Sequence, residues 1–535
     1  MVRPMEPPLS WAADRPAYRP LIMGRRGAVA ANHPLAAQAG LQALRAGGSA
    51  ADAAVATALA LAVVEPAMSG LGGDGFYHSF DGATGRSEVI NATGPAPAAA
   101  TVEEYRDGIP LAGPRAVSVP GMLAGLGMLH RRAGRLAWAE CAREAIALAE
   151  GGFAATHAYR ALAEEARDVL AAEPPALGAF VQNRDLARTL EEVAADGAET
   201  FYRGALATRL AAALADVGSL VTAADLEAFE PELQEPIAVD YRGFTVLEAP
   251  PNSVGFVLLE ELKIAERFDL AGMGLLSADA LHVLVEAKKL AFADRERWGA
   301  DPRTLEAPLE QLLSDDYAAA QAARIDMGRS APAVPTLTTT GQTTYFAVID
   351  GAGNAVSGIQ SINGAFGSGV VVGDTGILMN NRMAYWHLEP GHPNQLRPGR
   401  RVRHTMNPPI VLRDGELWGV FGTPGADVQV QVNLQVLTAM IDFGLDPQQA
   451  AELPRWSSSA PGQYADYPHE IEAALEIEAR VPRGVRDELA RRGHPVRTID
   501  DLGGPCNVEI IRRDPASGLL ACGSDPRNDG WAAAW

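Results

Sequence analysis

The sequence predicts a large α/β protein, because strand-like and helical patterns alternate along its 535 residues. The clearest strand signal is residues 341–363, where β-branched and aromatic residues fill two arms around a Gly/Asn-rich turn, as in a hairpin. The clearest helical signals are the alanine-rich segments 36–46 and 49–64, whose apolar residues on all sides predict closely packed, buried helices. A chain of this length can bury a sizeable core as one large unit or as two to four domains.

Composition argues against several classes of function. Asp and Glu number 66 and Lys and Arg 45, a net charge of −21, so we expect no nucleic acid partner. The longest apolar stretch, residues 50–66, contains two acidic residues and is too short to span a membrane, so we expect no membrane partner. Three cysteines without a C-x-x-C pair fit a reducing compartment, and residues 1–26 have no secretory apolar core. We therefore expect a cytoplasmic protein. Because no histidine or cysteine has metal-ligand spacing, we expect no metal and no cofactor.

The N-terminal half begins with a strand and then becomes helical. Residues 27–33 predict a short strand that leads into a helix starting near Pro34. The run 69–75 satisfies G-x-G-x-x-G, but it follows a helix and precedes a strand-like segment, 76–80, which is the reverse of the context of a dinucleotide site. Residues 126–226 predict a set of helices separated by Gly and Pro.

The middle of the chain combines strands, helices and a connector. Residues 236–247 alternate like a pair of edge strands, and 254–268 and 278–297 predict amphipathic helices. Residues 322–341, interrupted by Gly and Pro, predict a flexible connector that can be cut. Three polar residues share one face of the second helix, and we interpret them as packing residues: His282, Glu286 and Lys289.

The C-terminal part predicts a second hairpin and a turn that leads into a helix. Residues 409–412 and 417–421 flank an Asp-Gly turn, and 422–427 then precede a helix predicted for 428–442. Such a turn presents unpaired backbone N–H groups that can hold an oxyanion, although every helix start has such groups and a plain turn is the alternative. A further helix and a strand pair are predicted at 486–492, 506–511 and 519–523.

Thr343, near the start of the first hairpin, is the sharpest candidate for chemistry. If the chain is cut between Gln342 and Thr343, this residue carries both a hydroxyl nucleophile and a free α-amine. An α-amine has a pKa of about 8, so it can act as the base for the neighbouring hydroxyl at neutral pH. No catalytic histidine is then needed, and the chain has no G-x-S-x-G serine and no P-loop. Ordinary β-propensity at a strand start is the alternative explanation.

Eight motifs, spread from Gly27 to the C-terminal region, resemble the γ-glutamyltransferase family of N-terminal-nucleophile hydrolases. They are GAVAANHP from Gly27, GGSAADAAV from Gly47, GLGGDGF from Gly70, EAKKLAFADR from Glu286, TTYFAV from Thr343, GILMNN from Gly376, GTPGA from Gly422 and SDPR from Ser524. The resemblance implies a four-layer αββα fold. It also implies self-cleavage before Thr343, which gives a large subunit, 1–342, and a small subunit, 343–535, intertwined as one domain. The pair could form a homodimer.

The resemblance also implies roles for single residues. Thr343 would be the nucleophile, and Ser361 the second hydroxyl residue that steadies its amine. Asn363 would contact the substrate. Gly425 and Ala426 match two adjacent glycines whose amides form the oxyanion hole, and an alanine there is strained if the position needs a positive φ.

Both ionic anchors of a γ-glutamyl substrate are absent. The arginine that binds the α-carboxylate in the family falls near Thr93, and the aspartate that binds the α-amino group falls on Tyr385. The paired serines that help to hold the carboxylate become His404 and Thr405. A pocket without these counter-ions should reject a zwitterionic glutamyl group, so the chain is more similar to the acylase and oxamate amidohydrolase members. Three residues would offer charge or donors to a carboxylate on the acyl part: Arg382, Arg403 and His404.

We therefore expect an autoprocessing amidohydrolase that acts on a small acyl amide bearing a carboxylate, of oxamate or glutaryl type, through an acyl-threonine intermediate. The first alternative is a γ-glutamyltransferase or glutathione hydrolase with rearranged anchors. The second is an uncleaved, non-catalytic binding protein on the same scaffold. The intact sequence from Gln342 to Thr344 argues against this second alternative, since a decayed site need not keep its nucleophile.

Overall fold

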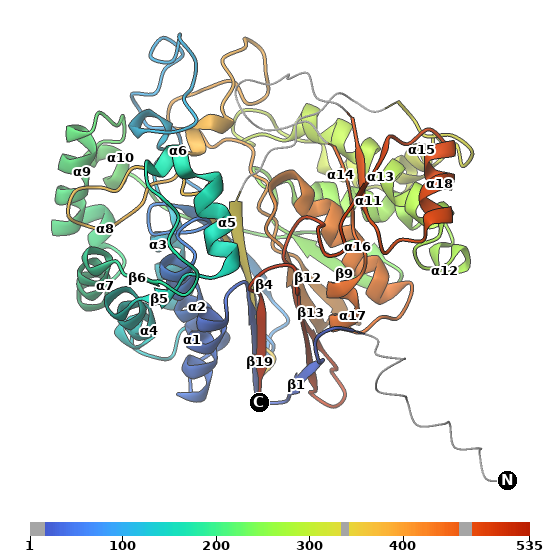
Figure 1. The fold of residues 1–535 in the computed structure, drawn as a ribbon, viewed down its shortest axis with the longest axis horizontal. Coiled ribbons are helices and arrows are strands. Elements are labelled where there is room, and N and C mark those ends of the chain that lie inside the picture. The colour runs from blue at the N-terminus through green and yellow to red at the C-terminus, as the bar shows by residue number, and fades with distance from the viewer. Residues whose placement is uncertain (1–16, 333–341, 460–472) are drawn as a thin grey trace.

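Two seven-stranded sheets pack face to face, and helices cover the outer face of each (Figure 1). The computed structural model describes residues 17–332, 342–459 and 473–535, so the part of the predicted cuttable connector from 333 to 341 lies outside the described residues. The layers follow the order helix, sheet, sheet, helix. This is the αββα sandwich that the resemblance implies.

The first sheet contains the predicted hairpin at its centre, and all of its strand pairs are antiparallel. Both arms of the hairpin are confirmed, with partners such as Phe346 and Gly358 directly opposite each other. Across the sheet the strands are β19 (Trp531–Ala534), β2 (Gly27–Ala31), β10 (Gln342–Asp350), β11 (Ala355–Asn363), β3 (Asp74–Phe80), β4 (Ser87–Ala92) and β7 (Glu232–Gln234).

The second sheet contains the second predicted hairpin and, at one edge, the predicted edge pair. The two C-terminal strands expected as a pair are part of this large sheet, because one of them also pairs with the hairpin. Across the sheet the strands are β1 (Ile22–Gly24), β18 (Leu520–Ser524), β17 (Glu509–Arg513), β13 (Glu416–Gly422), β12 (Ile410–Arg413), β9 (Phe244–Glu248) and β8 (Ile237–Tyr241).

Alanine-rich and amphipathic helices form the outer layers. Every residue of α2 (Ala50–Val64) is buried, and its start is fixed by a capping box between Ser49 and Asp52. With α1 (Pro34–Arg45) and α3 (Met122–Ala133) it packs on the first sheet. The second sheet is covered by α11 (Gly255–Ala265), α13 (Ala278–Trp298) and α16 (Gln429–Ile441), on the opposite side of the molecule in Figure 1.

Shorter elements surround these layers. The further helices are α4 (Trp138–Gly151), α5 (His157–Glu165), α6 (Arg167–Leu170), α7 (Arg184–Asp196), α8 (Thr200–Arg203), α9 (Ala205–Asp216), α10 (Ala223–Glu227), α12 (Leu270–Met273), α14 (Leu309–Leu312), α15 (Asp315–Ala322), α17 (Pro447–Glu452) and α18 (Arg483–Arg491). Three 3₁₀ turns are η1 (Pro114–Ala116), η2 (Arg382–Tyr385) and η3 (Ala426–Val428). The small strands are β5 (Phe153–Ala154), β6 (Phe180–Val181), β14 (Trp456–Ser458), β15 (Leu475–Glu478) and β16 (Val496–Ile499). Among the described residues, no helix is both long and apolar enough to cross a membrane.

The two faces of β10 contribute to two different cores. Phe346 and Val348 pack against the helices of the first layer, whereas Tyr345, Ala347 and Ile349 pack between the sheets. This is the alternation of side chains that a strand imposes. The strand that carries Thr343 is therefore held on both faces.

Candidate active site

Thr343 lies at the start of β10. Its hydroxyl lies next to the hydroxyl of Ser361, which in turn contacts a backbone carbonyl. Its side chain is almost fully buried, and its Oγ1 lies 3.4 Å from Ser361 Oγ. Ser361 Oγ in turn donates a hydrogen bond of 2.7 Å to the carbonyl of Gln342. That carbonyl belongs to the peptide bond predicted to be cut. The contacts thus connect the predicted nucleophile, the hydroxyl of Ser361 and the carbonyl of the predicted cleavage site.

Asn363, at the end of β11, lies next to this group. Its N–H donates to Ser361 Oγ at 2.8 Å, and its Nδ2 donates to the Asn381 carbonyl at 3.3 Å. Its backbone has a φ of +77°. Its side-chain oxygen is buried and has no hydrogen-bond partner among the described residues. A buried acceptor without a partner, close to Thr343, can accept a hydrogen bond from an N–H group of a substrate.

Asp74 links two of the predicted substrate-binding residues, and sequence reasoning missed this role. On β3 it pairs directly with Ser361 on β11. Its carboxylate binds Arg382 through two hydrogen bonds, of 3.1 and 3.2 Å, and His404 Nε2 at 3.2 Å. All of these side chains are buried. The sequence offered one indication of this role: Asp74 is the single acidic residue in the glycine-rich run 70–75, which leads into a buried strand.

The charges of this group balance at neutral pH. Burial alone would raise the pKa of Asp74, but Arg382 and His404 together hold it below its ordinary value. Burial and the Arg382 charge lower the pKa of His404 to about 4, although Asp74 acts in the opposite direction. At pH 7 His404 is therefore neutral, and the Asp74–Arg382 pair carries no net charge.

Tyr385 and Thr405 are two further buried residues close to His404. The Arg382 guanidinium lies 4.7 Å from the centre of the Tyr385 ring, and the rings of Tyr385 and His404 are 6.4 Å apart. Thr405 follows His404 and is buried beside it. Arg382, Tyr385, His404 and Thr405 therefore come together as predicted. Thr93 lies in a buried polar network, where Asn252 Nδ2 donates to its hydroxyl at 3.2 Å.

Arg403 has a different environment from Arg382. Its Nη1 donates to Glu296 at 2.7 Å, and the same Glu296 oxygen accepts from Arg295 at 2.7 Å. Arg295 also forms an ion pair with Asp427, the residue that follows Ala426. This buried ion-pair network ties Arg403 to the turn expected to form the oxyanion hole. A role of Arg403 in binding a carboxylate stays a prediction.

In the turn after β13, Ala426 has the positive φ that was the condition for strain at this position. Gly425 has a φ of +123° and Ala426 a φ of +47°, so the alanine occupies a left-handed conformation. The N–H of Val428 closes the turn by donating to the Gly425 carbonyl at 2.9 Å. The turn starts close to β10, the strand that carries Thr343. A Cβ on Gly422 would lie only 2.4 Å from the ring of Tyr345 on that strand.

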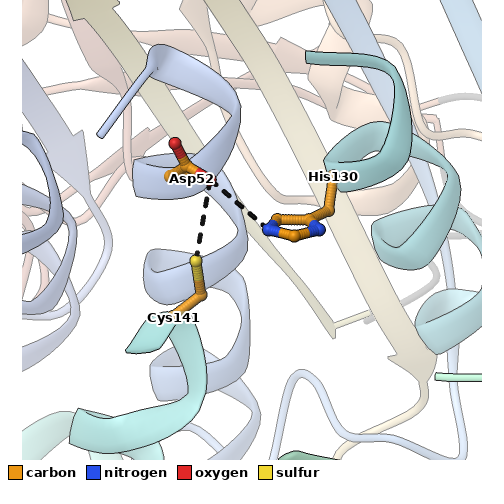
Figure 2. Close-up of side chains that lie close together, drawn as sticks. All are labelled: Asp52, His130 and Cys141. Atoms are coloured by element: carbon orange, nitrogen blue, oxygen red, sulfur yellow. Dashed lines mark hydrogen bonds and ion pairs between the residues drawn. The ribbon is translucent and has the colours of Figure 1, made fainter. Parts of the chain in front are cut away.

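The structure also brings together Asp52, His130 and Cys141, which sequence spacing did not predict (Figure 2). Asp52 acts as a helix cap, since its carboxylate accepts from the Ser49 N–H at 2.7 Å and from the Arg135 N–H at 2.8 Å. Burial and the nearby Asp52 raise the pKa of Cys141 to about 12, so its thiol is protonated at neutral pH. We interpret this group as a structural link between α2, α3 and α4.

A second polar group contains the three residues on α13 that we interpreted as packing residues. His282 Nδ1 lies 2.8 Å from His494 Nε2, and His282 Nε2 lies 3.0 Å from the carbonyl of Asp326. Lys289 donates to Glu286 at 2.7 Å. The group fixes the chain at Asp326, upstream of the predicted cleavage site, which agrees with a packing role.

Comparisons with known proteins agree with this site and fold. The family model described as gamma-glutamyltranspeptidase matches residues 36–535. A glutathione hydrolase-like YwrD proenzyme from Bacillus subtilis is 36% identical over 526 residues, which cover 96% of this chain and 99% of the relative. An oxamate amidohydrolase proenzyme from Klebsiella pneumoniae is 36% identical over 536 residues, which cover 95% and 98%.

Among solved structures, cephalosporin acylase from Bacillus halodurans superimposes with a TM-score of 0.89 at 36% identity, over 99% of both chains. A match of this extent covers all four layers as well as the turn at Gly425. The chain therefore belongs to the γ-glutamyltranspeptidase family and is an N-terminal-nucleophile-type hydrolase that acts on amide bonds.

Proposed function

We propose that the chain is a precursor that cuts itself between Gln342 and Thr343, and that Thr343 is the nucleophile of the mature enzyme. The observation that supports this most directly is the row of contacts from Thr343 Oγ1 through Ser361 Oγ to the Gln342 carbonyl. The proenzyme names of the relatives also support a precursor. The products would be residues 1–342 and 343–535, which together keep the single αββα unit.

Self-cleavage would begin with attack of Thr343 Oγ on the carbonyl carbon of Gln342. The Ser361 hydroxyl, which already donates to that carbonyl, would stabilise the developing negative charge on its oxygen. The C–N bond then breaks, the nitrogen takes a proton, and an ester joins Gln342 to the threonine oxygen. Water hydrolyses this ester and leaves Thr343 with a free amine and hydroxyl.

Turnover would use the same hydroxyl on an external amide. The α-amine of Thr343 takes the hydroxyl proton while the oxygen attacks the substrate carbonyl. The N–H groups of Gly425 and Ala426 would hold the oxyanion, and the amine would return the proton to the leaving nitrogen. Water then releases the acid from the acyl-threonine. Asn363, with its unsatisfied oxygen, would accept a hydrogen bond from the substrate.

The acyl group we propose is a small one that carries a carboxylate and no amine, as in oxamate or glutaryl amides. An ammonium group on the substrate would need a free acid, but Arg382 and His404 already occupy the Asp74 carboxylate. Arg382, which is held in place by two hydrogen bonds to Asp74, would supply the guanidinium that meets the carboxylate of the substrate. The name of the oxamate amidohydrolase relative supports an acyl group of this class.

A matched pair of substrates tests this proposal. Glutaryl-p-nitroanilide and γ-glutamyl-p-nitroanilide differ only in the α-amino group. We expect kcat/KM to be higher for the glutaryl compound, with little transfer of either acyl group to glycylglycine. If the γ-glutamyl compound is preferred tenfold, equivalent to about 1.4 kcal/mol of transition-state binding, the chain is a transferase or glutathione hydrolase with rearranged anchors.

A further inference from the structure

The carboxyl group of Glu65 is bonded directly to the strand that carries Thr343. Glu65 is the C-cap of α2, with its N–H bonded to the Leu61 carbonyl at 2.9 Å. Its own carbonyl accepts from the N–H groups of Met68 and Ser69 at 2.9 and 3.0 Å. Its backbone is thus held on both sides. Its Oε2 accepts a 2.6 Å hydrogen bond from the hydroxyl of Thr344, the residue next to the nucleophile.

This bond lies where the strand pairing is irregular. The register of β10 against β11 shifts between Gln342 and Thr344, so Thr343 lies inside the irregular stretch. A regular ladder of hydrogen bonds therefore does not fix its peptide units. Thr344 is completely buried, and its bond to Glu65 fixes the chain one residue beyond the nucleophile.

Burial, the Thr344 hydroxyl and Asp529 are the main influences on the Glu65 carboxyl group, and the cation Arg19 acts on its neighbour Glu509. Glu65 lines a cavity of about 20 Å³ with His33, Thr156 and Asp529, which is enough room for one water molecule. Asp529 accepts a hydrogen bond from the Thr156 hydroxyl, and the pKa of His33 is lowered by burial to about 4, so His33 is neutral at pH 7. A further acid, Glu509, lies close enough to interact with Glu65, and burial raises its pKa.

The ionisation of Glu65 therefore falls in an accessible pH range. Loss of solvation raises its pKa to about 8, the Thr344 hydrogen bond opposes this, and Asp529 adds to it. At neutral pH the carboxyl group is mostly protonated and uncharged. Its ionisation places a negative charge one residue from the Thr343 amine, which favours the ammonium form, and an ammonium cannot accept the hydroxyl proton.

We propose that Glu65 is a positioning residue for Thr343: by holding the Thr344 hydroxyl it fixes the irregular start of β10 for both self-cleavage and turnover. This inference rests on the proposed function of Thr343. Glu65 acts through Thr344, on the helix side of the sheet. Loss of the contact should therefore change rates rather than substrate binding.

A double-mutant cycle tests the contact. We expect Glu65→Ala and Thr344→Val each to slow precursor cleavage and to lower kcat about tenfold or more, with KM within about twofold, because a small displacement of a nucleophile is costly. The double variant should be no slower than the slower single variant, since both remove one bond. Glu65→Gln keeps an acceptor for the Thr344 hydroxyl, so it should recover part of the rate lost in Glu65→Ala.

A pH profile supplies a readout that a purely structural role would not change. Because ionised Glu65 raises the pKa of the Thr343 amine, kcat should increase with pH over a higher pH range in the wild-type enzyme than in Glu65→Gln, whose amide does not ionise. The same pH profile in both proteins would contradict the proposal. A Thr344→Val variant whose kcat and cleavage rate stay within twofold of wild type would also contradict it. So would a double variant whose loss of rate equals the product of the losses in the two single variants.

Matched controls separate this inference from the proposed function. Thr57→Val removes a buried hydroxyl on α2 that donates to the Ala53 carbonyl of the same helix. Cleavage and kcat of this variant should therefore stay within twofold of wild type. Thr343→Ala tests the nucleophile by itself. If Thr343→Ala still cleaves at the same bond and hydrolyses substrate, the proposed function fails; if it is inactive while Thr344→Val and Glu65→Ala behave as wild type, only the role of Glu65 fails.

Discussion

Gly425 and Ala426, the two residues proposed to form the oxyanion hole, should respond in opposite ways to exchange of glycine and alanine. Gly425 has a φ of +123°, which L-residues do not adopt without strain, and a Cβ at this position would lie 2.3 Å from Cys506 Sγ. Ala426 already has a side chain, at a φ of +47°, so its replacement by glycine removes strain and keeps the N–H group. The backbone donors should therefore be displaced by Gly425→Ala and preserved by Ala426→Gly.

The expected magnitudes follow from these contacts. For Gly425→Ala, backbone strain of about 1–3 kcal/mol and overpacking against Cys506 of about 1–3 kcal/mol should both destabilise the folded protein. Displacement of one oxyanion donor should cost about 2.7–4 kcal/mol in the transition state, a decrease in kcat of about 10²–10³-fold. For Ala426→Gly, relief of about 1–2 kcal/mol of left-handed strain is offset by about 0.4–1 kcal/mol of unfolded-chain entropy and about 0.8 kcal/mol for one buried methyl. Stability should then change by less than about 1 kcal/mol, and kcat should hold or rise.

Steady-state kinetics on the processed enzyme and urea unfolding measure both quantities. Cys506→Ala combined with Gly425→Ala should restore the stability lost to overpacking but not the kcat, because the φ of +123° remains unsuitable for alanine. Wild-type kcat in a folded Gly425→Ala enzyme would place the oxyanion hole elsewhere and refute this reasoning.

Two further predictions concern the buried ion pairs. Asp74→Asn leaves Arg382 buried without its counter-ion and should cost about 3–5 kcal/mol of stability at pH 7. Because the pKa of Asp74 is lowered in the folded state, its contribution is present above about pH 3.9 and is lost as the pH falls through the folded pKa, so urea unfolding should show the gap to wild type shrinking in acid. A lysine at position 295 cannot bind Asp427 and Glu296 together, so Arg295→Lys should lose one charged hydrogen bond, about 1.5–3 kcal/mol of stability. In this variant kcat should fall more than KM rises. Unchanged kinetics would show that this ion-pair network does not position the turn at residues 425–427.

Local patterns in the sequence predicted most of the fold. The hairpin around residues 351–354, the helices on either side of Gly47 and the edge strands before residue 248 all appear where period-2 or helical patterns placed them. Strand β19 was missed, because three alanines after Trp531 carry no strand signal and only pairing with β2 makes them a strand. The role of the two C-terminal strands was underestimated for the same reason: their partner, β13, is distant in sequence.

The site was predictable only as far as single residues carry a motif. Thr343 could be named from its own sequence context and Ser361 from the family resemblance, whereas a positive φ at Ala426 was considered only as a condition for strain. The partnership of Asp74 with Arg382 could not be predicted, because these residues are 308 positions apart and come together through contacts between distant segments, such as the bridge between Gly72 and Met379. For the same reason, the pairing of Arg403 with Glu296 was not predicted.

Self-cleavage at Thr343 is the central claim, and intact mass spectrometry with N-terminal sequencing of the purified protein tests it most directly. The account predicts that the wild-type protein consists of two chains, residues 1–342 and 343–535, and that the second begins Thr-Thr-Tyr-Phe. Thr343→Ala should remain a single full-length chain, and Thr343→Ser should still cleave, more slowly. An uncut wild-type protein that nevertheless hydrolyses amides, or a Thr343→Ala variant cut at the same bond, would contradict the account.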